Sequence, residues 1–162
     1  MHNALQPKYT FPQDSASLPN IEVLRQAFLA GRNIADLLTN NNPNLSREDI
    51  VEISYEIQSG TYTKFALEDP GKLEEYAKQI YQLSKDYVAD CEHILDCGAG
   101  ELTSLSALSY HLKASTCLHS CDISLSRLRF GRRFASQFMA GGLAHSLRLF
   151  VADMAKLPLP DL

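Results

Sequence analysis

The sequence predicts an α/β fold in which an N-terminal helical region precedes a set of parallel strands. Three strand candidates support this prediction, and each ends in an aspartate: Asp96 after the apolar Ile94-Leu95, Asp122 after residues 117–121, and Asp153 after residues 147–152. Short apolar runs of this kind are typical of buried strands in a parallel sheet. Gly98 and Gly100 directly follow the first run and allow the chain to turn sharply. Because ligands of open α/β sheets bind at the carboxyl ends of the strands, a binding site is expected where these acids meet.

The helical region precedes the first predicted strand. Apolar residues at helical spacing predict one amphipathic helix over residues 21–39, which the Asn-rich stretch 40–44 ends. Ser46 and Asp49 resemble a capping box and predict a second helix to about Ile57. The prolines of residues 1–20 and their lack of periodicity predict an extended arm.

A third helix is predicted from Asp69-Pro70, an N-cap followed by a proline at the first helical position. It extends to about Val88 and is expected to bury one apolar stripe, formed by Leu73, Tyr76, Ile80 and Leu83 or their neighbours. The chain then divides into three predicted parts: the arm at 1–20, a helical cap or lid region at 21–89, and a ligand-binding domain at 90–162.

Over residues 90–162 the chain resembles the class I S-adenosylmethionine-dependent methyltransferases. The matching segments are Asp96-Cys97-Gly98-Ala99-Gly100, Asp122-Ile123 and Ala152-Asp153-Met154. The resemblance implies the first three strands of a doubly wound, parallel Rossmann-like sheet that is incomplete, because the chain stops before strand four. The family often has a third glycine in the first motif, and this chain has Leu102 there.

The resemblance also implies a cofactor, S-adenosyl-L-methionine, and a role for each motif. Asp96, Gly98 and Gly100 would shape the methionine pocket together with Cys97 and Ala99. Asp122 would hold the ribose hydroxyls, and Ile123 would lie against the adenine face. Asp153 and Met154 would recognise the adenine edge. No catalytic side chain is nominated, because positioning a nucleophile against the sulfonium can supply much of the acceleration.

The three aspartates are chemically suited to S-adenosylmethionine as a ligand. S-adenosylmethionine has an ammonium group and two ribose hydroxyls, for which carboxylates are suitable acceptors. The alternative is a dinucleotide-binding oxidoreductase. The pyrophosphate of a dinucleotide is bound by backbone N–H groups of a Gly-x-Gly-x-x-Gly loop. Here the sixth position is Thr103, and an acid precedes the loop. These differences favour the methyltransferase.

Two further segments have alternative interpretations. Ser54–Tyr62 is similar to the lid that many small-molecule methyltransferases fold over the cofactor, so that Tyr62 or Gln58 would contact the methionine end; otherwise its tyrosines simply cap the core.

A helix capped by Ser124 is expected over roughly residues 125–140 and closed by Gly141-Gly142. Its arginines, between positions 127 and 133, indicate either an RNA-binding stripe or, as favoured here, a solvated face with the phenylalanines pointing inward.

The composition of the chain restricts its possible partners and its location less strongly than the motifs do. The chain has 162 residues, 45% of them hydrophobic, and a net charge of −4 that gives no general attraction to nucleic acid. The sequence lacks an export signal and a run of about 18 apolar residues, so no membrane span is expected. Four cysteines without metal-binding spacing predict reduced thiols in a cytoplasmic protein and no metal site.

The predicted function is methyl transfer from S-adenosylmethionine to a small molecule or a saccharide. The sequence is expected to be an N-terminal fragment that is inactive alone, because the strand beside the first one is missing and one wall of the crevice would be absent. The alternatives are an RNA methyltransferase that uses the 127–133 stripe and a noncatalytic half-domain that needs a partner chain. Homo-oligomerisation would also complete the sheet.

Overall fold

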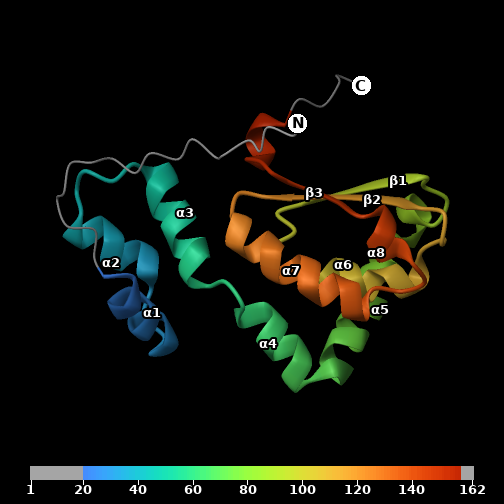
Figure 1. Ribbon diagram of the computed structural model, residues 1–162, viewed down its shortest axis with the longest axis horizontal. Coiled ribbons are helices and arrows are strands. Elements are labelled where there is room, and N and C mark those ends of the chain that lie inside the picture. The colour runs from blue at the N-terminus through green and yellow to red at the C-terminus, as the bar shows by residue number, and fades with distance from the viewer. Residues whose placement is uncertain (1–19, 158–162) are drawn as a thin grey trace, which may run out of the picture.

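The computed structural model describes residues 20–157, which form a helical region followed by an α/β region (Figure 1). The helical region contains α1 (Ile21–Leu29), α2 (Ile34–Asn41), α3 (Arg47–Ile57), α4 (Thr61–Glu68) and α5 (Pro70–Val88). The α/β region contains β1 (His93–Cys97), α6 (Thr103–Leu108), η1 (Ser109–His111), β2 (Cys117–Asp122), α7 (Leu125–Phe138), α8 (Leu143–Ser146), β3 (Arg148–Val151) and η2 (Met154–Lys156). The predicted arm lies outside the described residues except for Asn20.

The three strands form a parallel sheet in the order β1-β2-β3, which confirms the predicted fold class. In the register, Asp96 pairs with Ser120 and Asp122 pairs with Val151. Because side chains alternate between the faces of a strand, Asp96 and Asp122 belong to the same face, two positions apart. The two acids are therefore brought to the carboxyl end of the sheet on one side.

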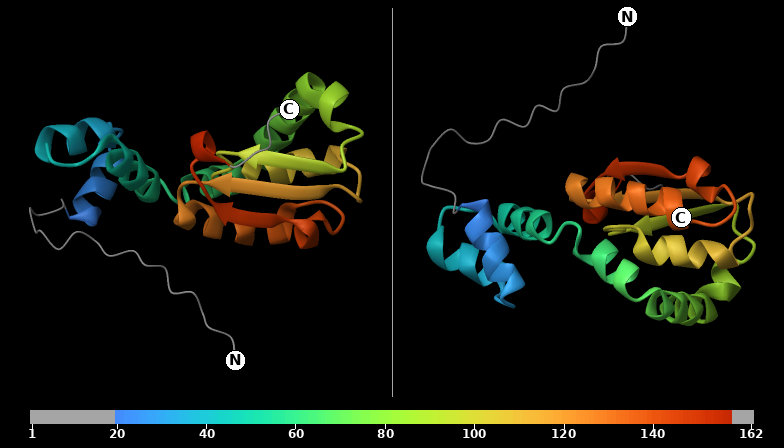
Figure 2. Two further views of the ribbon diagram at one scale, coloured as in Figure 1. Left: turned by 90° about the horizontal axis from the view of Figure 1, so that it is seen from above. Right: turned by 60° about the horizontal axis from the view of Figure 1, so that its bottom comes forward.

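Helices α5, α6 and α7 all lie on one face of the sheet (Figure 2). The core between this face and the helices contains Leu102, Leu105, Leu118, Ala135, Met139 and Leu143. A doubly wound sheet has helices on both faces, and the described residues supply those of one face. On the other face Phe150 of β3 keeps 39% of its surface exposed.

The first three helices have a separate small core of Leu24, Ile34, Leu38 and Ile57. The prediction of one helix over residues 21–39 is wrong, since the chain breaks between α1 and α2. Gly31 adopts a positive φ of 76°, which ends α1. Asn33 then caps α2, because its side chain accepts hydrogen bonds from the backbone N–H groups of Ala35 and Asp36.

The predicted starts of α3 and α5 are confirmed. Ser46 and Asp49 form the predicted capping box of α3, and Asp69 caps α5 ahead of Pro70. The predicted stripe of α5 is confirmed in part: Leu73 and Ile80 are half-buried and Ala77, the neighbour of Tyr76, is buried, whereas Tyr76 and Leu83 are exposed.

Helix α7 crosses the glycine loop, defined here as residues 98–102, at very close range. A Cβ atom on Gly131 would lie 2.7 Å from the carbonyl carbon of Glu101 and 2.8 Å from Cγ of Leu102. Atoms do not approach so closely, so a glycine at this point of α7 allows the helix to rest on the backbone of the loop.

Gly131→Ala is therefore expected to lower the free energy of unfolding by about 1–3 kcal/mol, the usual effect of overpacking. The clash should outweigh the better helix propensity of alanine, which favours the variant by at most about 1 kcal/mol. Urea denaturation measures the change, and Gln137→Ala on the exposed side of α7 is the control, with an effect within about 0.5 kcal/mol. A variant as stable as the unmodified chain would show that the loop moves aside at no cost.

Candidate functional site

The glycine loop turns directly over the end of β2. Gly98 and Gly100 adopt positive φ angles of 73° and 52°, which glycine reaches without steric cost. The N–H groups of Gly98 and Ala99 both donate to the carbonyl oxygen of Cys121, each at 2.9 Å. Backbone bonds to the neighbouring strand therefore hold the loop in place.

Leu102, the last residue of the glycine loop, adopts a backbone conformation that glycine reaches more easily than leucine. Its φ is +56°, the one positive value at a non-glycine residue among those described. A left-handed conformation costs a leucine about 1–2 kcal/mol. Leu102 is completely buried in the core under the sheet, and this burial offsets the strain.

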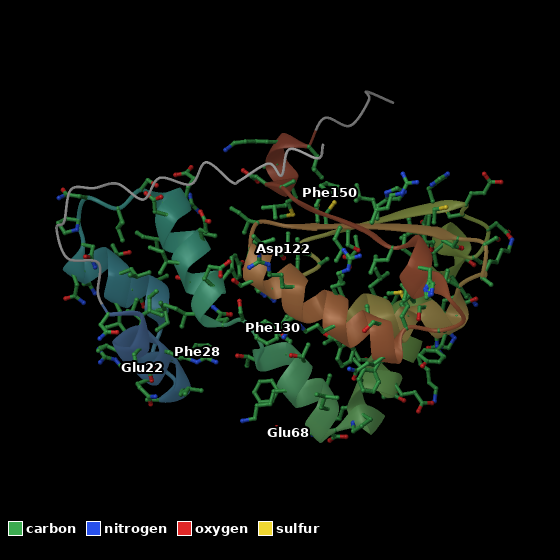
Figure 3. The ribbon with its side chains drawn as sticks, viewed as in Figure 1. Glu22, Phe28, Glu68, Asp122, Phe130 and Phe150 are labelled. Atoms are coloured by element: carbon green, nitrogen blue, oxygen red, sulfur yellow. The ribbon has the colours of Figure 1, made fainter. Side chains whose placement is uncertain are left out.

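Asp122 joins the first two sequence motifs. Its Oδ2 accepts a hydrogen bond from the N–H of Gly100 at 2.8 Å, and its Oδ1 accepts one from the N–H of Ser124 at 2.9 Å. The residue is only 4% exposed, and Figure 3 shows it at the end of β2, beside the first turn of α7. The acid that ends β2 is thus in direct contact with the glycine loop that follows β1.

Asp96 is the second acid at this point, and its ionised form is disfavoured. Burial, and then the negative charge of Asp122, raises the pKa of Asp96 to about 6. A carboxylate in this position is stabilised by a positively charged partner, which favours its ionised form. The site is consequently suited to a cationic group next to Asp96.

Two glutamates that were not singled out in the sequence connect the helical region to this site. Glu101 is 2% exposed, and its carboxylate accepts hydrogen bonds from the N–H groups of Gly60 at 2.8 Å and Thr63 at 2.7 Å. Glu56 accepts a hydrogen bond from the hydroxyl of Ser124 at 2.6 Å. No local sequence signal identifies these contacts, because their partners lie 38 to 68 positions away along the chain.

The predicted lid segment Ser54–Tyr62 is the end of α3, a turn, and the first two residues of α4. Phe130 of α7 packs against this turn, since a Cβ on Gly60 would lie 3.3 Å from its ring (Figure 3). Tyr62 lies over the guanidinium of Arg127, which in turn lies against Gly100. The structure thus brings Tyr62 to the glycine loop, whereas a contact of Gln58 or Tyr62 with a ligand stays a prediction.

The arginines of α7 divide into two groups. Arg129, Arg132 and Arg133 are exposed, as expected for a solvated helix face, whereas Arg127 is half-buried at the glycine loop. The expectation that the phenylalanines point inward holds for Phe134, which is 5% exposed, but not for Phe130 and Phe138, at 41% and 37%. Arg127 is a site residue that the sequence pattern assigned only to the basic stripe.

The third motif lies at the same edge of the sheet but is engaged locally. The backbone N–H of Ala152 donates to the carbonyl oxygen of Asp122 at 3.1 Å, which places the segment beside the end of β2. The carboxylate of Asp153 accepts from the N–H of Ala155 at 2.9 Å and pairs with Lys156 at 3.2 Å. The hydrogen bond from Ala155, and then that from Lys156, lowers the pKa of Asp153. Met154 is 65% exposed.

The other predicted site residues differ in accessibility. Ile123 and Ala99 are half-buried, and Cys97 is exposed at the end of β1. All four cysteines are free thiols. Within residues 20–157 no three His, Cys, Asp or Glu side chains are grouped so as to hold a metal ion.

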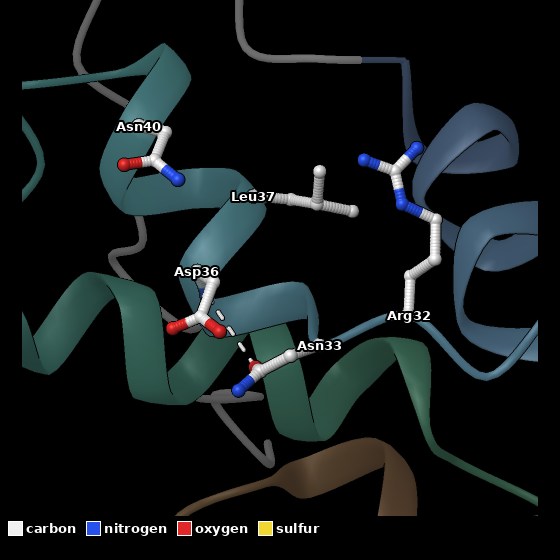
Figure 4. Close-up of a pocket in the computed structure, with 5 residues that line it drawn as sticks. All are labelled: Arg32, Asn33, Asp36, Leu37 and Asn40. Carbon is white, nitrogen blue, oxygen red and sulfur yellow. Dashed lines mark hydrogen bonds between the residues drawn. The ribbon is translucent and has the colours of Figure 1, made fainter.

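A shallow depression of about 280 Å³ lies in the helical region, at the start of α2 (Figure 4). Its lining consists of Arg32, Asn33, Asp36, Leu37 and Asn40. The side-chain oxygen of Asn33 is already used to cap α2, by accepting from Ala35 at 3.0 Å and Asp36 at 3.4 Å. This depression contains none of the motif residues, so the glycine loop remains the candidate site.

Across the described residues, none of the helices combines the length and the apolar composition that crossing a bilayer requires.

Comparison with known proteins gives a limited result. No protein-family model matches the chain, and no curated protein matches it. Among solved structures, the chain is similar to phosphoethanolamine N-methyltransferase 1 of Haemonchus contortus in complex with phosphoethanolamine and S-adenosylhomocysteine. The identity is 16% and the TM-score is 0.39, and the match covers 86% of this chain but 24% of that one. The similarity to a methyltransferase is therefore weak, and this chain spans about a quarter of that protein's length.

Proposed function

We propose that this chain binds S-adenosyl-L-methionine at the glycine loop and belongs to a methyltransferase that acts on a small molecule or a saccharide. The observation that carries the proposal is the hydrogen bond between the N–H of Gly100 and the carboxylate of Asp122. It joins the loop after β1 to the acid that ends β2, with Asp96 on the same face of the sheet. The motifs that resemble the family in sequence therefore converge in space.

The hydrogen bonds of the loop argue against a dinucleotide. The N–H groups of Gly98 and Ala99 donate to Cys121, and that of Gly100 donates to Asp122, so these three are not directed at an anion. A pyrophosphate at this point would also meet the carboxylates of Asp96 and Asp122, which repel it. A ligand with an ammonium group and hydroxyls meets acceptors instead.

The proposed roles follow from the chemistry of each side chain. The cofactor supplies a methyl group on a positively charged sulfur. Asp96 would accept hydrogen bonds from its ammonium group. Each oxygen of Asp122 has a further lone pair with which to accept from a ribose hydroxyl. Ile123 would pack on the adenine, and Asp153 with Met154 would lie at its edge.

The acceptor is proposed only by class, and the chain's own residues would act on it by positioning. Tyr62 lies at the loop and would cover the bound cofactor, which excludes water from the approach of the nucleophile. The four free thiols support a reducing compartment, which we propose to be the cytoplasm.

Calorimetric titration of the purified chain with S-adenosylhomocysteine and, separately, with NAD tests the proposal. Binding of the first ligand alone is expected, and Asp122→Ala should abolish it. Because Asp122 also bonds to the backbone of the loop, circular dichroism must show that the variant is folded. A folded chain that binds NAD, or that binds neither ligand, would contradict the proposed cofactor.

A further inference from the structure

Arg127 differs from the other arginines of α7 in where its side chain lies. Its backbone N–H donates to the hydroxyl of Ser124 in the first turn of the helix, at 3.2 Å. Its guanidinium reaches the glycine loop, where a Cβ on Gly100 would lie 2.5 Å from Nη2. Any side chain at position 100 would displace this group. Gly100 thus serves both the turn of the loop and the close approach of Arg127.

Two tyrosines from the helical region fix the guanidinium there. The central carbon of the group lies 5.2 Å from the ring centre of Tyr55 and 5.1 Å from that of Tyr62. Both distances are within the range of cation–π attraction. Since Tyr55 is in α3 and Tyr62 is in α4, the two sides of the turn hold one cation.

The guanidinium of Arg127 has at least one N–H group without an acceptor. Its Nε is buried and makes no hydrogen bond, and among the described residues no carboxylate lies within ion-pair distance of Arg127. Two acids at the site accept hydrogen bonds from other groups. Asp122 accepts from Gly100 and Ser124, and Glu101 accepts from Gly60 and Thr63. A half-buried cation without an anionic partner is costly, and an anionic group of a ligand would satisfy it.

We propose that Arg127 binds the carboxylate at the amino-acid end of S-adenosylmethionine and thereby determines which adenosine compounds the site accepts. The proposal rests on the proposed function, and neither the sequence motifs nor the basic stripe assign this role to position 127. Asp96 and Arg127 then receive opposite ends of one zwitterion, the ammonium and the carboxylate. A guanidinium suits this task, because its parallel N–H groups match the two oxygens of a carboxylate.

The test compares two ligands that differ only at the amino-acid end. S-adenosylhomocysteine has the α-amino acid, whereas 5′-methylthioadenosine has the same nucleoside and sulfur without it. Arg127→Met keeps an unbranched side chain between the tyrosines but removes the charge. It is expected to weaken S-adenosylhomocysteine roughly 10- to 100-fold, as loss of charge-assisted hydrogen bonds does. Its affinity for 5′-methylthioadenosine should change by no more than about twofold, within the scatter of a surface substitution.

Arg129→Met is the matched control, since Arg129 is an exposed arginine of the same helix. It should alter neither affinity. Selective weakening of S-adenosylhomocysteine by Arg127→Met alone supports the proposal. An unchanged affinity, an equal loss for both ligands, or tighter binding of both would overturn it and leave the proposed function intact. If the unmodified chain binds neither ligand, the proposed function fails and this inference fails with it.

Discussion

Replacing Glu101 by alanine is expected to lower the free energy of unfolding by about 3–5 kcal/mol, because two buried hydrogen bonds to a carboxylate are lost together. The N–H groups of Gly60 and Thr63, at the start of α4, would have no acceptor in its place. Helix α4 contacts both α6 and α7, so its displacement would also separate Tyr62 from the glycine loop. Urea denaturation followed by circular dichroism measures the loss.

Glu68→Ala is the control for this prediction. Glu68 lies at the other end of α4 and is exposed, and its interaction among residues 20–157 is a long surface ion pair with Lys64 at 3.8 Å. Its removal should change stability by less than about 1 kcal/mol. Equal effects of the two substitutions would show that the Glu101 contacts do not stabilise the α4 start.

Asp96→Asn is expected to stabilise the ligand-free chain and to weaken its ligand. Burial and the charge of Asp122 raise the pKa of Asp96 from 3.8 to about 6. A raised pKa means that folding favours the protonated acid, so its stabilising contribution is complete below pH 4 and is lost as the pH rises through 6. Asparagine has no such charge. The variant should therefore exceed the unmodified chain by up to about 3 kcal/mol above pH 6, and by little near pH 4.

The same substitution removes the acceptor proposed for the ammonium group. The affinity for S-adenosylhomocysteine should fall about tenfold at neutral pH, and the affinity of the unmodified chain should rise as the pH increases through 6. Thermal or urea denaturation at several pH values, and calorimetry at the same values, measure both effects. Asp86→Asn, at an exposed position in α5, should stay within about 0.5 kcal/mol of the unmodified chain. A stability difference that does not vary with pH would refute the explanation.

The two predictions concern different parts of the site. Glu101 holds α4 against the glycine loop, and Asp96 with Asp122 forms the acidic edge under it. A protein stabilised by Asp96→Asn but deficient in binding would be an instance of a functional site maintained at a cost in stability.

Local signals in the sequence were sufficient to predict the three strands and several helix starts. Short segments that end in an aspartate predicted β1, β2 and β3, because acids at the carboxyl ends of parallel strands are typical of a binding site in an α/β fold. Ser46, Asp69 and Ser124 predicted helix starts, since a capping side chain acts within three residues. The break between α1 and α2 also has a local signal, the Gly31 turn followed by the Asn33 cap, which the helical periodicity of residues 21–39 concealed.

The sequence by itself therefore determined the strands, the caps of α3, α5 and α7, and the glycine loop, because each has a signal within a few neighbouring residues. Only the tertiary structure decided which acids remain free for a ligand and which are used internally. Glu101 caps a helix some 40 residues away, Asp122 bonds to the loop 22 positions before it, and Arg127 turns from the basic face toward Tyr55 and Tyr62. The physical reason is that the packing of segments far apart in the sequence decides which group a charged side chain contacts. Composition and periodicity describe neighbouring residues, so they do not predict such contacts.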